Sequence, residues 1–83
     1  RGYDVAIGKV DQAEVDFIAT KTDETLYVQV TESMVSEEVR RRELAPLQKI
    51  RDNYEKIVLS MDTGLDSSYD GIKSLNLIQW LLG

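Results

Sequence analysis

The side chains that could do chemistry in this 83-residue chain are limited, because it contains neither histidine nor cysteine. Thiolate zinc sites and disulfides are excluded, and so is the commonest general base. Asp, Glu, Lys, Tyr, Ser and Thr remain, and their oxygen atoms suit a hard cation such as Mg²⁺. Asp16 lies in the middle of a segment in which apolar and polar residues alternate, and it is the first candidate for such chemistry.

The position of Asp16 depends on two segments that have the pattern of β-strands. Apolar and polar residues alternate over Ala13 to Lys21 and again over Thr25 to Thr31, which is the period of a strand with one buried face. The polar segment between them is short enough for a hairpin turn centred on Thr22-Asp23. The pattern therefore predicts an antiparallel pair.

That turn fixes which residues face each other. Asp16 is placed opposite Gln29, and Glu14 opposite Thr31, on the face away from the apolar residues. The Gln29 amide can donate to the Asp16 carboxylate, so the pair can satisfy itself without a metal ion. The predicted apolar pairs are Val15 with Val30, Phe17 with Val28, and Ala19 with Leu26.

The remaining elements complete a mixed sheet. We expect a first strand at Tyr3 to Val10, a polar break at Asp11 to Ala13, and a helix capped by Ser36, kinked or divided at Pro46 and ending at Asp52-Asn53. A short strand at Ile57 to Leu59, a loop at Thr63 to Asp70, a strand at Ile72 to Leu77 and a helix at Ile78 to Leu82 follow. A three-strand antiparallel meander, a helical crossover and further strands predict a single α/β domain with flanking helices.

Composition narrows the class of partner. The net charge of -5 and the pI near 4.6 argue against a domain that binds nucleic acid over its whole surface. Arg40, Arg41 and Arg42 are expected to pair with neighbouring glutamates, and Trp80 to pack on the core.

No apolar run reaches the length of a membrane span, and the lack of cysteine favours the cytoplasm. Tyr3, Tyr27 and Tyr54 are expected at the rim of the core.

Three stretches carry a family resemblance: Arg1 to Val5, Glu14 to Ala19 and Leu26 to Thr31. They resemble the C-terminal domain found on many bacterial and archaeal AAA-plus-like ATPases, which is similar to the PD-(D/E)XK nuclease superfamily. The resemblance continues through Asp52-Asn53-Tyr54 to Leu82. It implies a restriction-endonuclease-like domain over residues 1–83 that lacks its first helix and ends a longer ATPase chain. ATP would bind only upstream, since no Gly-x-x-x-x-Gly-Lys-Ser/Thr motif is present.

The resemblance also implies a degenerate metal site. In such nucleases an acidic residue on one strand and an acid-x-Lys on the next converge on magnesium. Asp16 matches the first carboxylate, whereas Gln29 stands where the second acid belongs and Thr31 where the lysine belongs. Asp16 and Gln29 could still hold Mg²⁺ through oxygen atoms, but the site has lost one negative charge and its cation.

We therefore expect a non-catalytic accessory or recognition module, not itself an enzyme and without a cofactor of its own, whose partner is the upstream ATPase domain. One alternative is a divalent-metal-dependent DNA nuclease with a migrated catalytic cation, for which Lys21 or a helix arginine is the candidate. The other is a protein-protein interaction domain that binds the ATPase core or a second copy and does not touch nucleic acid.

Overall fold

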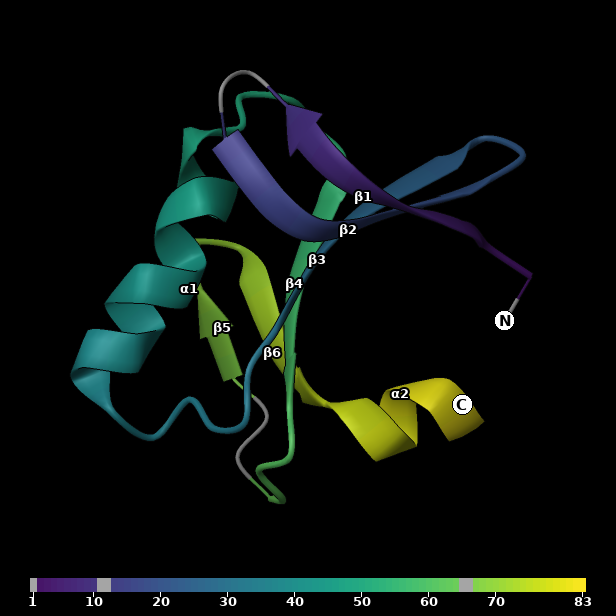
Figure 1. The fold of residues 1–83 in the computed structure, drawn as a ribbon. Coiled ribbons are helices and arrows are strands. Elements are labelled where there is room, and N and C mark those ends of the chain that lie inside the picture. The colour runs from purple at the N-terminus through teal and green to yellow at the C-terminus, as the bar shows by residue number, and fades with distance from the viewer. Residues whose placement is uncertain (1, 11–12, 65–66) are drawn as a thin grey trace.

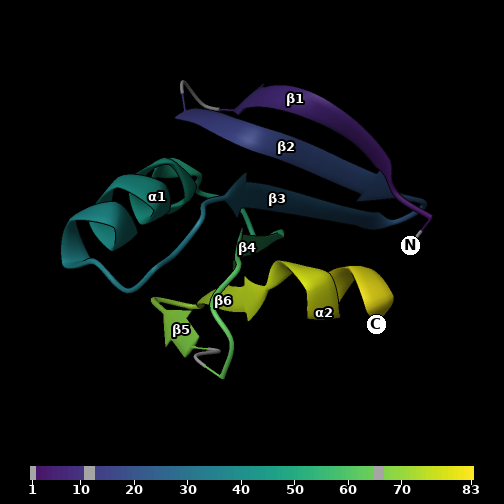
Figure 2. The same cartoon turned by 60° about the horizontal axis from the view of Figure 1, so that its bottom comes forward.

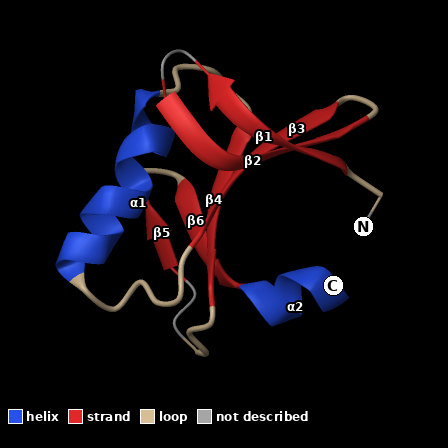
Figure 3. Ribbon diagram, in the orientation of Figure 1, coloured by secondary structure: helices blue, strands red, loops and turns tan. Residues whose placement is uncertain are grey.

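The computed structural model describes residues 2–10, 13–64 and 67–83, which form an α/β fold around one mixed sheet (Figure 3). The elements are β1 (Asp4–Val10), β2 (Ala13–Lys21), β3 (Glu24–Val30), α1 (Glu37–Lys49), β4 (Glu55–Ser60), β5 (Ser67–Tyr69), β6 (Ile72–Asn76) and α2 (Leu77–Leu82). The predicted α/β class, with its meander, helical crossover and flanking helices, is confirmed.

The strands lie in the order β1-β2-β3-β4-β6-β5. β1, β2 and β3 form the antiparallel meander, and α1 carries the chain from β3 to the parallel strand β4. β6 continues the sheet parallel to β4, and the short strand β5 pairs antiparallel with β6 at the far edge. The meander thus occupies one half of the sheet and leaves β1 as its outermost strand.

The two helices lie on opposite faces of the sheet (Figures 1 and 2). The α1-side cluster consists of buried Ala13, Val15, Tyr27, Met34, Leu44, Leu47, Ile50, Val58 and Ile72. The α2-side cluster consists of buried Ala19, Leu26, Val28, Ile57 and Leu59, with Trp80 and other partly buried residues packed against it. Trp80 therefore packs on the core, as predicted. Neither helix has the length and apolar character needed to cross a membrane, among the residues that the structure describes.

Helix α1 begins where the sequence predicts. The Ser36 side chain accepts a hydrogen bond from the Val39 amide at 3.4 Å, and acidic residues occupy the first turn. Pro46 lies inside the helix but does not divide it, because the fully buried Leu47 anchors that turn on the sheet. Of the predicted kink or division at Pro46, the division is wrong. The helix ends at Lys49, before the predicted end at Asp52-Asn53.

The strand predictions hold to within a residue or two, with one omission. β2 has the predicted bounds, and β6 ends at Asn76 because that side chain caps α2. Strand β5 (Ser67–Tyr69) lies in the segment predicted to be a loop, which also includes residues 65 and 66, outside the described part. The predicted break at Asp11-Gln12 also falls on residues outside that part, while Ala13 already belongs to β2.

Candidate functional site at the β2 bulge

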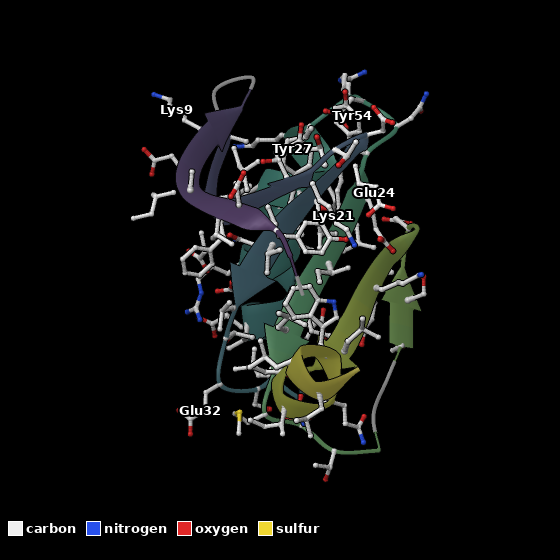
Figure 4. The ribbon with its side chains drawn as sticks, turned by 90° about the vertical axis from the view of Figure 1, so that its right-hand side faces the viewer. Lys9, Lys21, Glu24, Tyr27, Glu32 and Tyr54 are labelled. Atoms are coloured by element: carbon white, nitrogen blue, oxygen red, sulfur yellow. The ribbon has the colours of Figure 1, made fainter. Side chains whose placement is uncertain are left out.

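The β2–β3 hairpin has the predicted turn and register. Its ladder pairs Phe17 with Val28 and runs to Lys21 and Glu24, which lie beside each other in Figure 4. Thr22, in the two-residue turn, has a φ of 27°, the positive value that such tight turns require. The hairpin argument is therefore confirmed up to Phe17, where the backbone ladder ends.

A bulge in β2 begins at that point. β1 pairs Ala6 with Ile18 and Gly8 with Val15, so Ile7 alone stands opposite both Asp16 and Phe17. An extra residue on one strand of an antiparallel pair is a β-bulge, which bends the strand and disturbs its pairing. Gly8 belongs to this arrangement, because a Cβ there would collide with the Ile18 side chain.

The bulge reverses the faces of β2 on either side of it. Val15 packs in the α1-side cluster, whereas Ala19 packs in the α2-side cluster. Strict alternation would have placed both on one face. The predicted pairing of Val15 with Val30 is wrong for this reason, since Val30 packs against the α2-side cluster.

Asp16 and Gln29 bridge the strands where the ladder stops. The Asp16 backbone N–H donates to Gln29 Oε1 at 2.8 Å, and the Val30 backbone N–H donates to Asp16 Oδ2 at 2.9 Å. Each side chain accepts from the opposite strand's backbone. The prediction that Asp16 lies beside Gln29 is confirmed. Beyond Phe17, hydrogen bonds to these two side chains replace the backbone hydrogen bonds between β2 and β3.

Gln29 also reaches the helix. Its side chain is buried, with 5% of the residue exposed, and Nε2 donates to the backbone carbonyl of Glu43 on α1 at 3.3 Å. One oxygen facing a donor and one nitrogen facing an acceptor fix the orientation of the amide. The amide therefore donates to α1, and the predicted donation to the Asp16 carboxylate does not occur.

The other predicted site residues lie apart from this bridge. The Thr31 backbone N–H donates to the Leu59 carbonyl at 3.0 Å, and Lys21 lies at the hairpin end. Glu14 pairs with Lys9 of β1, and its predicted partner Thr31 lies beyond the β2–β3 ladder. Within residues 2–10, 13–64 and 67–83, no group of three or more acidic side chains is placed to hold a metal ion.

An open groove of about 870 Å³ runs beside the bulge. A smaller, wholly apolar pocket of about 180 Å³ adjoins it on the α2 side, and Phe17 and Val30 line both. The large groove is lined by Ile7, Gly8, Lys9, Glu14, Val15, Asp16, Phe17 and Val30. The lining thus combines apolar side chains with one basic and two acidic side chains.

A second polar cluster, which the sequence pattern did not predict, lies around Asp52. Tyr27 is buried, not at the rim, and its hydroxyl donates to Asp52 Oδ2 at 2.7 Å. The Lys56 ammonium donates to Asp52 Oδ1 at 3.0 Å and lies over the Tyr27 ring. Burial tends to raise the pKa of Asp52, but hydrogen bonds from Tyr27, Lys56 and the Tyr54 amide outweigh it and lower the pKa. In the sequence, this cluster could have been recognised from Asp52, Tyr54 and Lys56, which follow one another at intervals of two residues.

Asp62 holds two loops together in a similar way. It accepts hydrogen bonds from the Met34 backbone N–H and the Ser33 hydroxyl, each at 2.7 Å. These bonds, the Met34 one foremost, lower the pKa of Asp62. The loop before α1 is thereby tied to the end of β4, which makes this cluster structural.

The three consecutive arginines of α1 have different partners. Arg41 pairs with Glu37 at 3.0 Å and Arg42 with Glu43 at 3.5 Å, as predicted. Arg40 instead donates to the backbone carbonyls of Met34 and Val35. All three act locally on α1 and the loop before it.

Comparison with known proteins finds a relative by sequence. An uncharacterized protein of Haemophilus influenzae is 42% identical over 82 residues, which cover 99% of this chain and 20% of that protein. The chain thus spans about a fifth of the length of this curated relative. No protein-family model matches the chain, and no solved structure matches it at a significant level.

Proposed function

We propose that the chain is a non-catalytic accessory module of a longer, ATP-binding protein, with a restriction-endonuclease-like fold whose metal site has become a structural bridge. The observation that carries the proposal is the pair of hydrogen bonds between β2 and β3 made by Asp16 and Gln29. In this proposal the partner is an upstream ATPase domain, and the cytoplasm is the compartment.

The bonds of Gln29 argue against a ligand role. A metal ion would need the amide oxygen, which already accepts from the Asp16 backbone N–H. Releasing it would leave the part-buried Asp16 N–H without its partner, which costs up to about 1–3 kcal/mol. An amide also brings no charge to offset that of a divalent cation.

Two further observations support an accessory role. The relative from Haemophilus influenzae is about five times as long as this chain, so the matched segment is one part of a larger protein there. The groove beside the bulge is bordered by apolar Ile7, Phe17 and Val30. Such a surface favours contact with protein over contact with nucleic acid.

A nuclease assay tests the absence of catalysis. The chain and its parent protein are incubated with single-stranded, duplex and branched DNA in Mg²⁺ or Mn²⁺, beside the Asp16→Ala variant. We expect no cleavage above the variant's background. Metal-dependent cleavage that Asp16→Ala abolishes would overturn the proposal in favour of the nuclease.

Stability measurements test the structural role of Asp16 independently. Asp16→Ala removes the acceptor for the Val30 N–H and should lower the free energy of unfolding by about 1 kcal/mol, which is roughly 4–8 °C in Tm. Asp16→Asn keeps an acceptor oxygen and should lie close to wild type. Glu14→Ala, a neighbouring exposed carboxylate, is the control. Equal loss in the Asn and Ala variants would contradict a hydrogen-bonding role.

A further inference from the structure

The two edges of the sheet are built differently. β5 has only three residues, Ser67–Tyr69, and so offers little backbone for another strand to pair with. β1 has seven residues, Asp4–Val10, contains no proline, and pairs only with β2 within the described part of the chain. Folded proteins usually shorten, charge or cover such an edge, because its backbone groups can pair with another chain. Figure 2 shows β1 as the outermost strand, and no helix or strand of the described residues covers it.

Two aliphatic side chains on this edge are exposed. Val5 is 61% exposed and Ile7 is 87% exposed. Val5 stands opposite Ala19 of the α2-side cluster, and Ile7 follows it by two residues, so both project from the α2 face. Together with Phe17 they extend the apolar surface of the groove to the edge of the sheet. Neither belongs to the two core clusters of the described residues.

We propose that β1 pairs antiparallel with β1 of a second copy of this chain, about a two-fold axis centred on Ala6. Such an axis stands perpendicular to the sheet and keeps the α2 faces of both copies on one side, so facing residues must have numbers of the same parity. Val5 then stands opposite Ile7 of the second copy, and Ile7 opposite Val5. The four side chains form one apolar cross-strand cluster.

The neighbouring registers are less favourable. An axis on Ile7 would put Val5 opposite Lys9, and an axis on Val5 would shorten the ladder and separate the two aliphatic pairs. Centred on Ala6, the register sets Asp4 opposite Gly8, and no like charges face each other. Each chain carries a net charge of -5, so repulsion between the copies should weaken as salt screens it. Neither Asp16 nor Gln29 enters this inference, which therefore stands apart from the proposed function.

Disulfide trapping tests the register directly, because the chain has no cysteine of its own. In Ala6→Cys, the two introduced residues would be opposite each other, with Cα atoms about 4.5–5.5 Å apart, which a disulfide can span. In the control Asp4→Cys, the offset of four residues separates them by roughly 13 Å. We expect covalent dimers under mild oxidation for the first variant only. Equal cross-linking of both variants, or none in Ala6→Cys, would overturn the register.

Sedimentation velocity on the 83-residue chain tests the association itself. Wild type should show a concentration-dependent dimer that tightens with added salt. Ile7→Lys places a charge in the apolar cluster and should weaken the dimer at least tenfold, whereas Val35→Lys, an equally drastic change at a 63% exposed site remote from β1, should not. Circular dichroism of each variant checks that it is folded. A strictly monomeric wild type at roughly millimolar concentration, or an Ile7→Lys dimer as tight as wild type, would overturn the proposal.

Discussion

The Gln29 amide does what a carboxylate cannot do in the same place. It meets a backbone donor on β2 with its oxygen and a backbone acceptor on α1 with its nitrogen. A carboxylate has two acceptors and no donor when ionised. An amide at this position is thus what the local hydrogen bonding requires.

Replacing Gln29 by an acid should therefore destabilise the fold. In Gln29→Glu, one carboxylate oxygen would face the Glu43 carbonyl, and we expect a loss of about 1–3 kcal/mol in the free energy of unfolding at neutral pH. Burial next to an acceptor should raise the folded pKa of the new carboxyl. The protonated form can donate to Glu43, so the deficit relative to wild type should shrink as the pH falls toward the usual Glu pKa of about 4.3.

Urea unfolding at pH 7 and pH 5 measures this, with wild type followed at each pH. Gln79→Glu provides a matched control, because Gln79 is exposed and its side chain lies on the opposite helix. A Gln29→Glu variant as stable as wild type at pH 7 would show that the amide bridge contributes little.

The sequence predicted the contact of Asp16 with Gln29 but not its geometry. Turn chemistry fixes the hairpin locally, and the register follows from it up to Phe17. The bulge depends on pairing with β1, a non-local interaction that a period of two cannot reveal, and so the face of Val15 was predicted wrongly. Gly8 within a strand pattern was the available hint, since an interior glycine often marks a bulge or a close approach.

At the scale of elements, strands with strong alternation were predictable and the weakest one was not. β5 consists of Ser67, Ser68 and Tyr69, and without an apolar alternation it has no signal of its own. It forms because β6 offers an edge to pair with. Pro46 does not divide α1, because helix propensity describes an isolated helix and the burial of Leu44 and Leu47 overrides it.

Two carboxylates connect elements that are distant in sequence, and this makes the fold sensitive to acid. Asp52 links β3 to the segment before β4, and Asp62 links the end of β4 to the segment before α1. Both have lowered pKa values in the folded chain. Their contribution to stability is therefore complete above the unfolded Asp pKa of about 3.9 and is lost as the pH falls through the lower folded values.

The expected result is an acid unfolding transition that begins below about pH 4. Asp62→Asn removes one titrating group, so the variant should be less stable at pH 7 and should depend less on pH below 4. Circular dichroism in urea across this range measures both effects. Glu32→Gln is the control, because the Glu32 side chain is exposed and points away from the molecule (Figure 4). Parallel pH profiles for wild type and Asp62→Asn would contradict this role.

At the scale of the whole molecule, one sheet supports two separate apolar clusters. β3 and β4 supply residues to both, through Tyr27 and Val58 on the α1 side and Val28 and Leu59 on the α2 side. Neither face can lose its packing without disturbing strands that the other face needs. A chain of this size has little stability in reserve, so the two layers should unfold together.

This coupling can be measured with the chain's single tryptophan, Trp80, which reports on the α2 side alone. Leu44→Ala changes only the α1 side and should lower the free energy of unfolding by about 2–5 kcal/mol through the lost packing. Because the strands are shared, the Trp80 fluorescence transition should move with the circular dichroism transition by the same amount. Leu82→Ala, at a residue 83% exposed, should move neither. If the fluorescence transition stays in place while the circular dichroism transition shifts, the faces unfold independently, and the shared strands do not couple them.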